Sequence, residues 1–143
     1  MTTARDLMKP CPCIAETATV TEIVGKLAGD DMALVVVDDQ GHLTGIVTEY
    51  DLVKLIYQSG EYNLDAAVGG RIPAYLGMSP DQLKALTASE IMTCAPDTVP
   101  PTVSAEDLAE TMFRNRRKVV LVAEQGRPLG IIQRMDLVHK VLG

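Results

Sequence analysis

The stretch that decides the fold is ALVVVDDQGHLTGIVTEYDL at residues 33–52, which recurs in degenerate form as KVVLVAEQGRPLGIIQRMDL at residues 118–137. Each copy has an aliphatic run, an acidic-Gln-Gly turn and a second apolar run, a pattern typical of a β-hairpin. The sequences DLVKLI and DLVHKVL then read as closing helices. The chain is therefore predicted to contain the same hairpin–helix unit twice.

The similarity continues upstream of each hairpin. Four segments resemble helix starts, because Ser or Thr stands three residues before an acidic residue, as in a capping box. They are TARDLM (3–8), TVTEI (19–23), TASEIM (87–92) and TVSAEDL (102–108). Thr19 and Ser104 are the predicted N-caps of the two longer helices, since apolar residues follow them at helical spacing. Each copy is expected to be a short helix, an extended stretch, a helix, a hairpin and a helix.

The two copies are expected to form one α/β (α+β) body. A unit of this size has too small an interior to be stable alone, so we expect two β-α-β-β-α repeats packed sheet to sheet with pseudo-twofold symmetry. The predicted organisation is repeat one at residues 1–57, a helical linker or insert at 58–86, and repeat two at 87–143. Within the insert, Gly69-Gly70 and Pro73 are expected to interrupt regular structure, and Ser79-Pro80 is expected to start a helix.

Composition and charge restrict the possible functions. Of 143 residues, 47% are hydrophobic, with one Phe and no Trp, so the core must be aliphatic. No apolar run approaches the roughly 20 residues that span a bilayer, and the N-terminus MTTARDLMKP lacks a secretory signal. A cytoplasmic protein without a membrane partner is expected. The net charge of −6 makes nucleic acid an unlikely partner, although RNRRK at 114–118 is locally basic.

The sequence offers no pattern for metal or covalent chemistry. The sequence has an odd number of cysteines, Cys11, Cys13 and Cys94, which argues against a disulfide framework. The segment CPC does not have the redox spacing Cys-x-x-Cys, and no further Cys or His completes a zinc site. No phosphate-loop, nucleophile-elbow or His-Glu-x-x-His motif is present. We therefore predict no metal site, no catalytic residues and no enzyme activity.

The duplicated block, together with the Thr-Ala-x-acid-Ile/Leu-Met opening, resembles the tandem CBS domain, or Bateman module, of regulatory proteins. The resemblance covers nearly the whole chain except residues 57–86. It implies a module that senses adenosyl compounds such as AMP, ADP or ATP in clefts between the repeats. It also implies a homodimer that needs no cofactor and modulates a separate, unknown effector protein.

The resemblance further implies which residues contact the ligand in a primary cleft. In the family, the Asp of a Gly-apolar-apolar-Thr/Ser-x-x-Asp motif accepts hydrogen bonds from the ribose hydroxyls, and the Thr/Ser lies beside the sugar or phosphate. By this match Asp51 is the ribose acceptor and Thr48 the hydroxyl. Because the clefts are built crosswise, the facing residues would be Thr93, Cys94, Asp97, Arg116, Arg117 and Lys118, whose cations suit phosphates.

A second cleft is implied around Asp136, with Gln133 in place of the Thr. The residues facing it would be Lys9, Pro10, Met32 and Ala33, and Asp31 would add an anionic wall. The long amide of Gln133, and Asp31 and Met32 in place of Arg116 and Arg117, predict weaker nucleotide binding here. The alternative interpretation is that both Asp residues are helix N-caps, since each precedes an apolar LV helix and Asp is favoured at the N-cap. Capping and ligand binding are compatible.

Two other functions stay open at the level of sequence. One is a ligand-independent dimerisation or scaffold module that uses the insert as contact surface. The other is a binder of S-adenosylmethionine, NAD or nucleic acid, although scarce aromatic residues weaken the case for RNA. The insert has no assigned role.

Overall fold

The computed structural model describes residues 1–29, 31–60 and 75–143. The first half contains α1 (Ala4–Leu7), β1 (Cys13–Ala15), α2 (Val20–Leu27), β2 (Ala33–Val37), β3 (Leu43–Thr48) and α3 (Glu49–Ser59). The second half contains α4 (Pro80–Lys84), α5 (Ala88–Ile91), β4 (Thr93–Cys94), β5 (Thr98–Val99), α6 (Ala105–Arg114), β6 (Val119–Glu124), β7 (Arg127–Gln133) and α7 (Arg134–Leu142). From α5 onward the order of the first half returns, as the repeat predicts, with the short strand β4 added between α5 and β5.

The predicted helix starts are confirmed by their hydrogen bonds. The hydroxyl of Thr19 accepts from the backbone N–H of Glu22 at 3.3 Å, and that of Ser104 accepts from Asp107 at 3.1 Å. Ser79 caps α4 with Pro80 in its first turn. The predicted breaks at Gly69, Gly70 and Pro73 lie outside the described residues.

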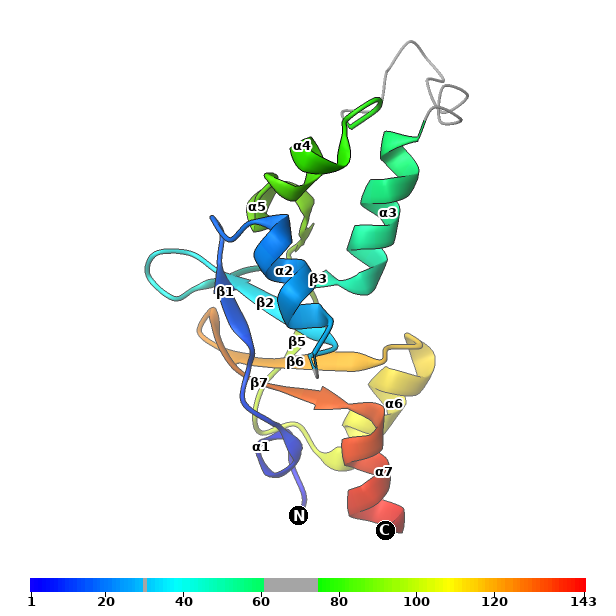
Figure 1. Ribbon diagram of the computed structural model, residues 1–143. Helices are drawn as coiled ribbons and strands as arrows, with labels where there is room; N and C mark the ends of the chain where they lie inside the picture. The colour runs from blue at the N-terminus through cyan, green and yellow to red at the C-terminus, as the bar shows by residue number, and fades with distance from the viewer. Residues whose placement is uncertain (30, 61–74) are drawn as a thin grey trace, which may run out of the picture.

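Two stacked sheets form the centre of the molecule (Figure 1). One sheet has the strand order β1-β2-β3-β4 and the other β5-β6-β7, and both hairpins, β2–β3 and β6–β7, are antiparallel. Val35, Leu121 and Ile131 are buried between the sheets. α2, α3, α4 and α5 cover one sheet, and α1, α6 and α7 cover the other (Figure 1). The predicted fold, with two repeats packed sheet to sheet, is confirmed.

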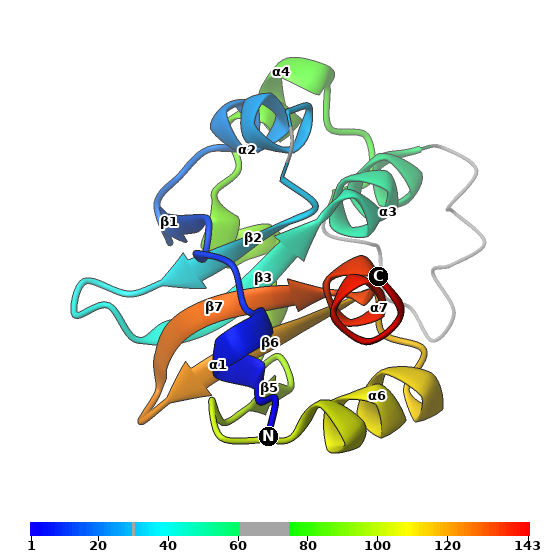
Figure 2. The same ribbon diagram turned by 90° about the horizontal axis from the view of Figure 1, so that it is seen from below.

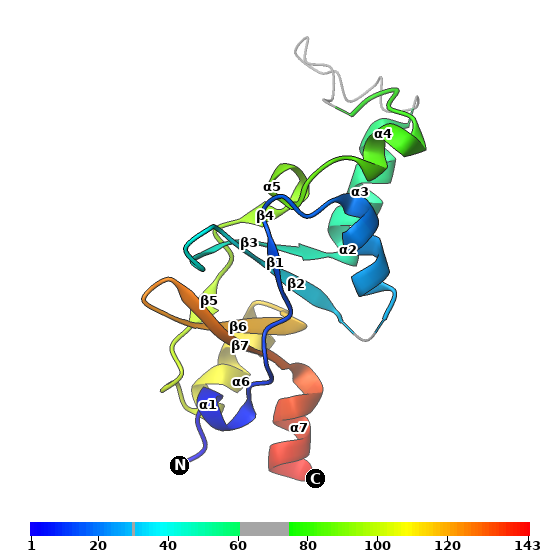
Figure 3. The ribbon, with the colours of Figure 1, turned by 60° about the vertical axis from the view of Figure 1, so that its left-hand side comes forward.

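The short opening helices are exchanged between the two halves. The backbone N–H of Ala4 in α1 donates to Val103 O at 2.9 Å, just before α6. Reciprocally, the N–H of Ala88 in α5 donates to Ala18 O at 2.8 Å, just before α2. The chain therefore runs from α1, beside α6, across to β1 in the other layer (Figure 3). Residues that follow each opening helix consequently meet the other repeat.

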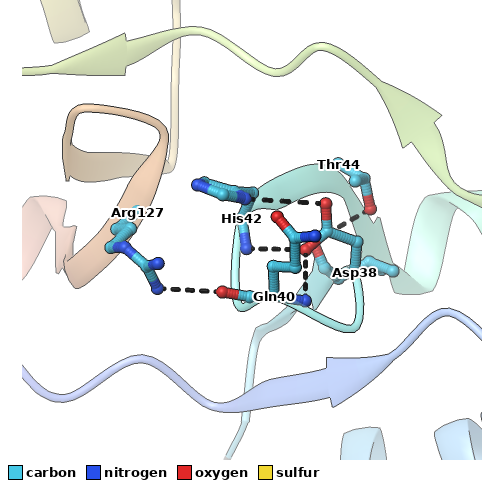
Figure 4. A network of polar contacts seen from close by, with 6 residues as sticks. Asp38, Gln40, His42, Thr44 and Arg127 are labelled. Atoms are coloured by element: carbon cyan, nitrogen blue, oxygen red, sulfur yellow. Dashed lines mark hydrogen bonds and ion pairs between the residues drawn. The ribbon is translucent and has the colours of Figure 1, made fainter.

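The hairpin turns lie together on one side of the molecule, away from α3 and α7 (Figure 2). Arg127 Nη1 donates to Gln40 O at 2.9 Å, and the N–H of Leu43 donates to Gly126 O at 2.7 Å. Within the first turn, Asp38 Oδ1 accepts from the N–H groups of Gln40 and His42 at 2.9 Å each (Figure 4). These bonds, led by that from His42, lower the pKa of Asp38 below its ordinary value.

No helix among residues 1–29, 31–60 and 75–143 is long and apolar enough to cross a membrane.

Candidate functional site

The first cleft is organised around the carboxyl group of Asp51, a buried residue with 7% exposure at the start of α3. Its Oδ2 accepts from the N–H of Thr48 at 2.8 Å. Its Oδ1 accepts from the hydroxyl of Thr93 at 3.1 Å, across 42 residues of sequence. The exchange of the opening helices brings Thr93 here, because Thr93 directly follows α5. One oxygen thus fixes the helix start, and the other meets the opposite repeat.

The geometry corrects the proposed capping role of the two Asp residues. They were interpreted as possible N-caps, but α3 begins two residues earlier, at Glu49, and its N-cap is Thr48. α7 likewise begins at Arg134, with Gln133 as its N-cap. Each Asp occupies the third helical position and accepts from the backbone N–H of the N-cap residue, as in the second half of a capping box. Capping therefore uses only one of the two carboxylate oxygens.

A cleft of about 680 Å³ opens beside Asp51. It lies where β3 passes into α3 and where the segment after α6 approaches from the second repeat. Its lining residues are Met32, Ile46, Thr48, Glu49, Tyr50, Asp51, Thr93, Arg116, Arg117, Lys118 and Val119. The structure thus brings together six of the eight residues predicted for the primary cleft.

The basic wall of this cleft has an unusual backbone. Arg116 has φ of 50°, the left-handed region in which glycine is usual after a helix. The N–H of Arg117 donates to Met112 O at 3.2 Å, the six-to-one bond of a Schellman motif. A non-glycine residue in this conformation costs roughly 1–2 kcal/mol. The strain is consistent with a functional use of the Arg116 side chain at the cleft.

The three cations of the wall differ in their partners. Arg117 Nη2 pairs with Asp97 Oδ2 at 2.6 Å, so part of its charge is already compensated. Within the described part of the chain, no ion pair joins Arg116 or Lys118 to an acidic residue. Arg116 and Lys118 are therefore the cations best able to receive an anionic group.

A smaller hollow of about 220 Å³ adjoins the cleft and shares with it Ile46, Thr93, Arg117 and Val119. Its floor is formed by β5 and β6, and Asp97 lies at its edge rather than in the main cleft. The full lining is Ile46, Thr93, Ala95, Pro96, Asp97, Thr98, Val99, Thr111, Asn115, Arg117, Val119, Val120 and Leu121. A flat, largely apolar group could enter from the main cleft.

The second cleft, of about 420 Å³, lies beside Asp136. Asp136 Oδ2 accepts from the N–H of Gln133 at 2.8 Å, as in the first cleft. Its Oδ1, however, pairs with the ammonium group of Lys9 at 2.8 Å. The lining residues are Asp6, Leu7, Lys9, Gln133, Met135, Asp136, His139 and Lys140.

Several predicted positions differ from expectation. Met32 was expected in the second cleft but lines the first, and Ala33 is fully buried and pairs with Thr48. The reason is that antiparallel pairing sets the start of β2 beside the end of β3 in the same repeat. Pro10 and Cys94 line neither cleft, and Cys94 pairs with Gly45 through the backbone.

The resemblance placed Lys9 opposite Asp136 but did not predict the ion pair between them. The signal was available, because Lys9 follows TARDLM as Thr93 follows TASEIM. The two residues therefore occupy matching positions, and each reaches the carboxyl group of the cleft it faces.

The cysteines do not form a reactive centre. Cys11 is half-buried against the core between the sheets, and burial, together with the neighbouring Cys13, raises its pKa to about 12. Burial also raises the pKa of Cys13. Among the residues described, no group of three or more His, Cys, Asp or Glu side chains could hold a metal ion.

The fold and the paired clefts agree with the comparison with protein families. The family model for the CBS domain matches residues 4–58 and 88–143. This chain belongs to the CBS domain family and carries two copies of the domain. No curated protein matches its sequence.

Solved structures similar to this chain are CBS-domain proteins. The CBS domain of a CBS domain-containing membrane protein from Sphaerobacter thermophilus is 30% identical, with a TM-score of 0.71, over 99% of this chain and 89% of that one. CBSX2, solved in complex with AMP, is 22% identical, with a TM-score of 0.74, over 99% and 97%. The cytosolic domain of the Mg²⁺ channel MgtE, solved with ATP, is 22% identical, with a TM-score of 0.68, over 98% of this chain and 49% of that one.

Proposed function

We propose that this protein is a regulatory module that binds an adenine nucleotide (AMP, ADP or ATP) in the first cleft and thereby modulates a separate effector protein. The observation that carries the proposal is the arrangement around Asp51. A carboxylate oxygen that is not needed for the helix cap faces the cleft, with Arg116 and Lys118 on the opposite wall. A carboxylate accepts from two hydroxyl donors at once, and cations receive phosphates.

The dimensions of the cleft support the same assignment. The ribose would bind at Asp51 and Thr48, the phosphates would extend toward Arg116 and Lys118, and the adenine would enter the adjoining hollow. A cleft of about 680 Å³ falls within the usual size of small-molecule sites. The complexes of CBSX2 with AMP and of MgtE with ATP provide precedent for such ligands in proteins of similar fold.

We also propose that the protein forms a homodimer through the outer faces of α3 and α7. The two helices carry exposed apolar residues at matching positions, Tyr50, Val53 and Ile56 on α3 and Met135, Val138 and Val141 on α7. Phe113 on α6, 84% exposed, lines a groove of about 560 Å³ together with Val138 of α7. Such apolar faces are typical of obligate homodimers. Light scattering should return twice the mass of 15.4 kDa, and a monomer at micromolar concentration would contradict the assembly.

A thermal-shift panel of AMP, ADP, ATP, NAD and S-adenosylmethionine tests the ligand. A compound at 100 times its dissociation constant should stabilise the fold by roughly 2.7 kcal/mol. We expect a shift with at least one of AMP, ADP and ATP, and its loss in the Asp51→Ala variant. A shift with S-adenosylmethionine or NAD, and with none of AMP, ADP and ATP, would contradict the proposed ligand and identify the other compound as the ligand.

The second candidate function is a ligand-independent dimerisation or scaffold module. The exposed apolar faces of α3 and α7 are the observation that favours it, since they need no ligand to associate. No shift across the whole panel, together with a stable dimer, would support this function instead.

A further inference from the structure

The two clefts have matching backbones at the residue that approaches each carboxyl group. A Cβ added to Gly45 would lie 2.9 Å from Thr93 O, and one added to Gly130 would lie 2.7 Å from Lys9 O. Lys9 and Thr93 therefore pass equally close to the strand that leads into each site. The main difference at this position is the side chain.

That side chain reaches the same carboxylate oxygen in both clefts. Thr93 Oγ1 donates to Asp51 Oδ1 at 3.1 Å, and Lys9 Nζ pairs with Asp136 Oδ1 at 2.8 Å. The other oxygen of each carboxyl group accepts from its N-cap backbone at 2.8 Å. The oxygen available to a ligand is therefore shared with a neutral hydroxyl in one cleft and with an ammonium group in the other.

The ammonium group is the harder neighbour to displace. A charge-assisted hydrogen bond is roughly twice as strong as a neutral one. The Asp136 side chain is 12% exposed and that of Lys9 is 58% exposed, so water screens the lysine end of the pair more than the carboxylate end. The backbone of Lys9 is also fixed, because it exchanges hydrogen bonds of 2.8 and 2.9 Å with Ile131 in β7. A neutral ribose hydroxyl would have to compete with this ammonium group for the remaining lone pairs of Asp136.

We propose that the ion pair between Lys9 and Asp136 prevents ribose from binding in the second cleft. The chain then has one nucleotide site, in the first cleft. The proposal rests on the proposed function, because it takes the ribose-accepting role of Asp51 as its reference. Lys9 thereby determines how many nucleotides bind per chain. Its ion pair also connects the segment after α1 to the first turn of α7.

Calorimetric titration with AMP tests the proposal through variants that copy the first cleft. Lys9→Thr, and Lys9→Thr combined with Gln133→Thr, reproduce Thr93 and Thr48 at their matching positions. We expect one AMP per chain in the wild type and two in the double variant, and Lys9→Arg, which keeps the ion pair, should stay at one. Adding Asp51→Ala to the double variant should return the count to one, now in the second cleft.

Two outcomes would overturn the proposal. If the double variant, folded as judged by circular dichroism, still binds one AMP, Lys9 does not close the cleft. If the wild type binds two and Lys9→Thr loses one, Lys9 is a ligand-binding cation instead.

Failure of the proposed function is recognised separately. In that case the wild type binds no AMP, while the ion pair is still measurable without ligand. Urea unfolding of Lys9→Thr, Asp136→Asn and the combined variant should give a combined loss smaller than the sum of the single losses. Additive losses would mean that the pair is not formed, which overturns the proposal whatever AMP does.

Discussion

Asp51 and Asp136 occupy the third position of matching helices, and each accepts the same 2.8 Å hydrogen bond from the residue three positions before it. Their second oxygens differ, since one meets the hydroxyl of Thr93 and the other the ammonium group of Lys9. The first contact belongs to the local helix start, and the second is supplied by the other half of the chain. The duplication has thus kept the scaffold of both clefts and changed the residue that faces each carboxyl group.

The comparison is tested most strongly by removing each carboxyl group in turn. A hydrogen bond to a charged acceptor is worth roughly 1.5–3 kcal/mol, so Asp51→Ala should weaken AMP binding about 10- to 150-fold at ~1.4 kcal/mol per decade. Asp136→Ala should change it far less. Both variants lose a helix cap, which makes Asp136→Ala the matched control for stability. If calorimetry finds that Asp136→Ala alone abolishes binding, the roles of the clefts are reversed.

In each cleft a glycine lies close to the backbone of the opposite repeat, so replacing either glycine should lower stability by a similar amount. Gly45→Ala and Gly130→Ala would push a Cβ to 2.9 Å from Thr93 O and 2.7 Å from Lys9 O. Each should lower the free energy of unfolding by about 1–3 kcal/mol, as overpacking usually does.

Gly25→Ala in α2 is the control, because nothing lies within 4 Å of the new Cβ. It should leave stability unchanged or raise it by up to about 1 kcal/mol. Urea unfolding measures all three variants, and an equal loss in Gly25→Ala would show that crowding at the clefts is not the cause.

The basic wall should make the first cleft, and not the second, bind ATP more tightly than adenosine. Exposed charge pairs contribute roughly 0.2–1 kcal/mol, so Lys118→Ala should weaken ATP binding about 1.4- to 5-fold and leave the affinity for adenosine unchanged. Added salt should narrow the difference. Arg116→Gly should weaken ATP similarly while it stabilises the fold, since glycine relieves the left-handed backbone at this position. An equal loss for adenosine would mean that the wall does not contact phosphate.

The smallest effect is expected where neither cleft is involved, at the hairpin turns. The folded-state pKa of Asp38 is lowered chiefly by the N–H of His42, so its contribution to stability is present above the unfolded pKa near 3.8 and is lost as pH falls through the folded value. The urea midpoint of Asp38→Asn should therefore depend less on pH between 5 and 2 than that of the wild type. Nucleotide affinity at neutral pH should be unchanged, and a loss would connect the turns to the cleft.

Much of the fold followed from local chemistry. The caps at Thr19, Ser104 and Ser79 and the two hairpins were predicted because side chain–backbone bonds and alternating apolar residues act over a few positions. The N-caps of α3 and α7 were misassigned by three residues, because Thr48 and Gln133 are the last residues of strands and give no separate signal. Met32 and Ala33, expected at the second cleft, lie elsewhere for a different reason, since strand pairing sets Ala33 beside Thr48 and leaves Met32 at the first cleft.

By itself, the sequence determined that this protein is a duplicated α/β module with an aliphatic core, and it marked Thr48, Asp51 and Arg116–Lys118 as one candidate site. The repeat and the aliphatic core follow from residue type and short spacing, whereas the grouping of these residues into one site was implied by the resemblance to the tandem CBS domain. The resemblance implied that Thr93 faces Asp51 and that Lys9 faces Asp136, but only the tertiary structure decided which contact each side chain makes with the carboxyl group. The exchange of α1 and α5 carries Lys9 to Asp136 and Thr93 to Asp51, because each opening helix pairs with backbone groups of the opposite repeat. A contact across 42 or 127 residues leaves no local pattern, since it exists only once the two sheets have packed.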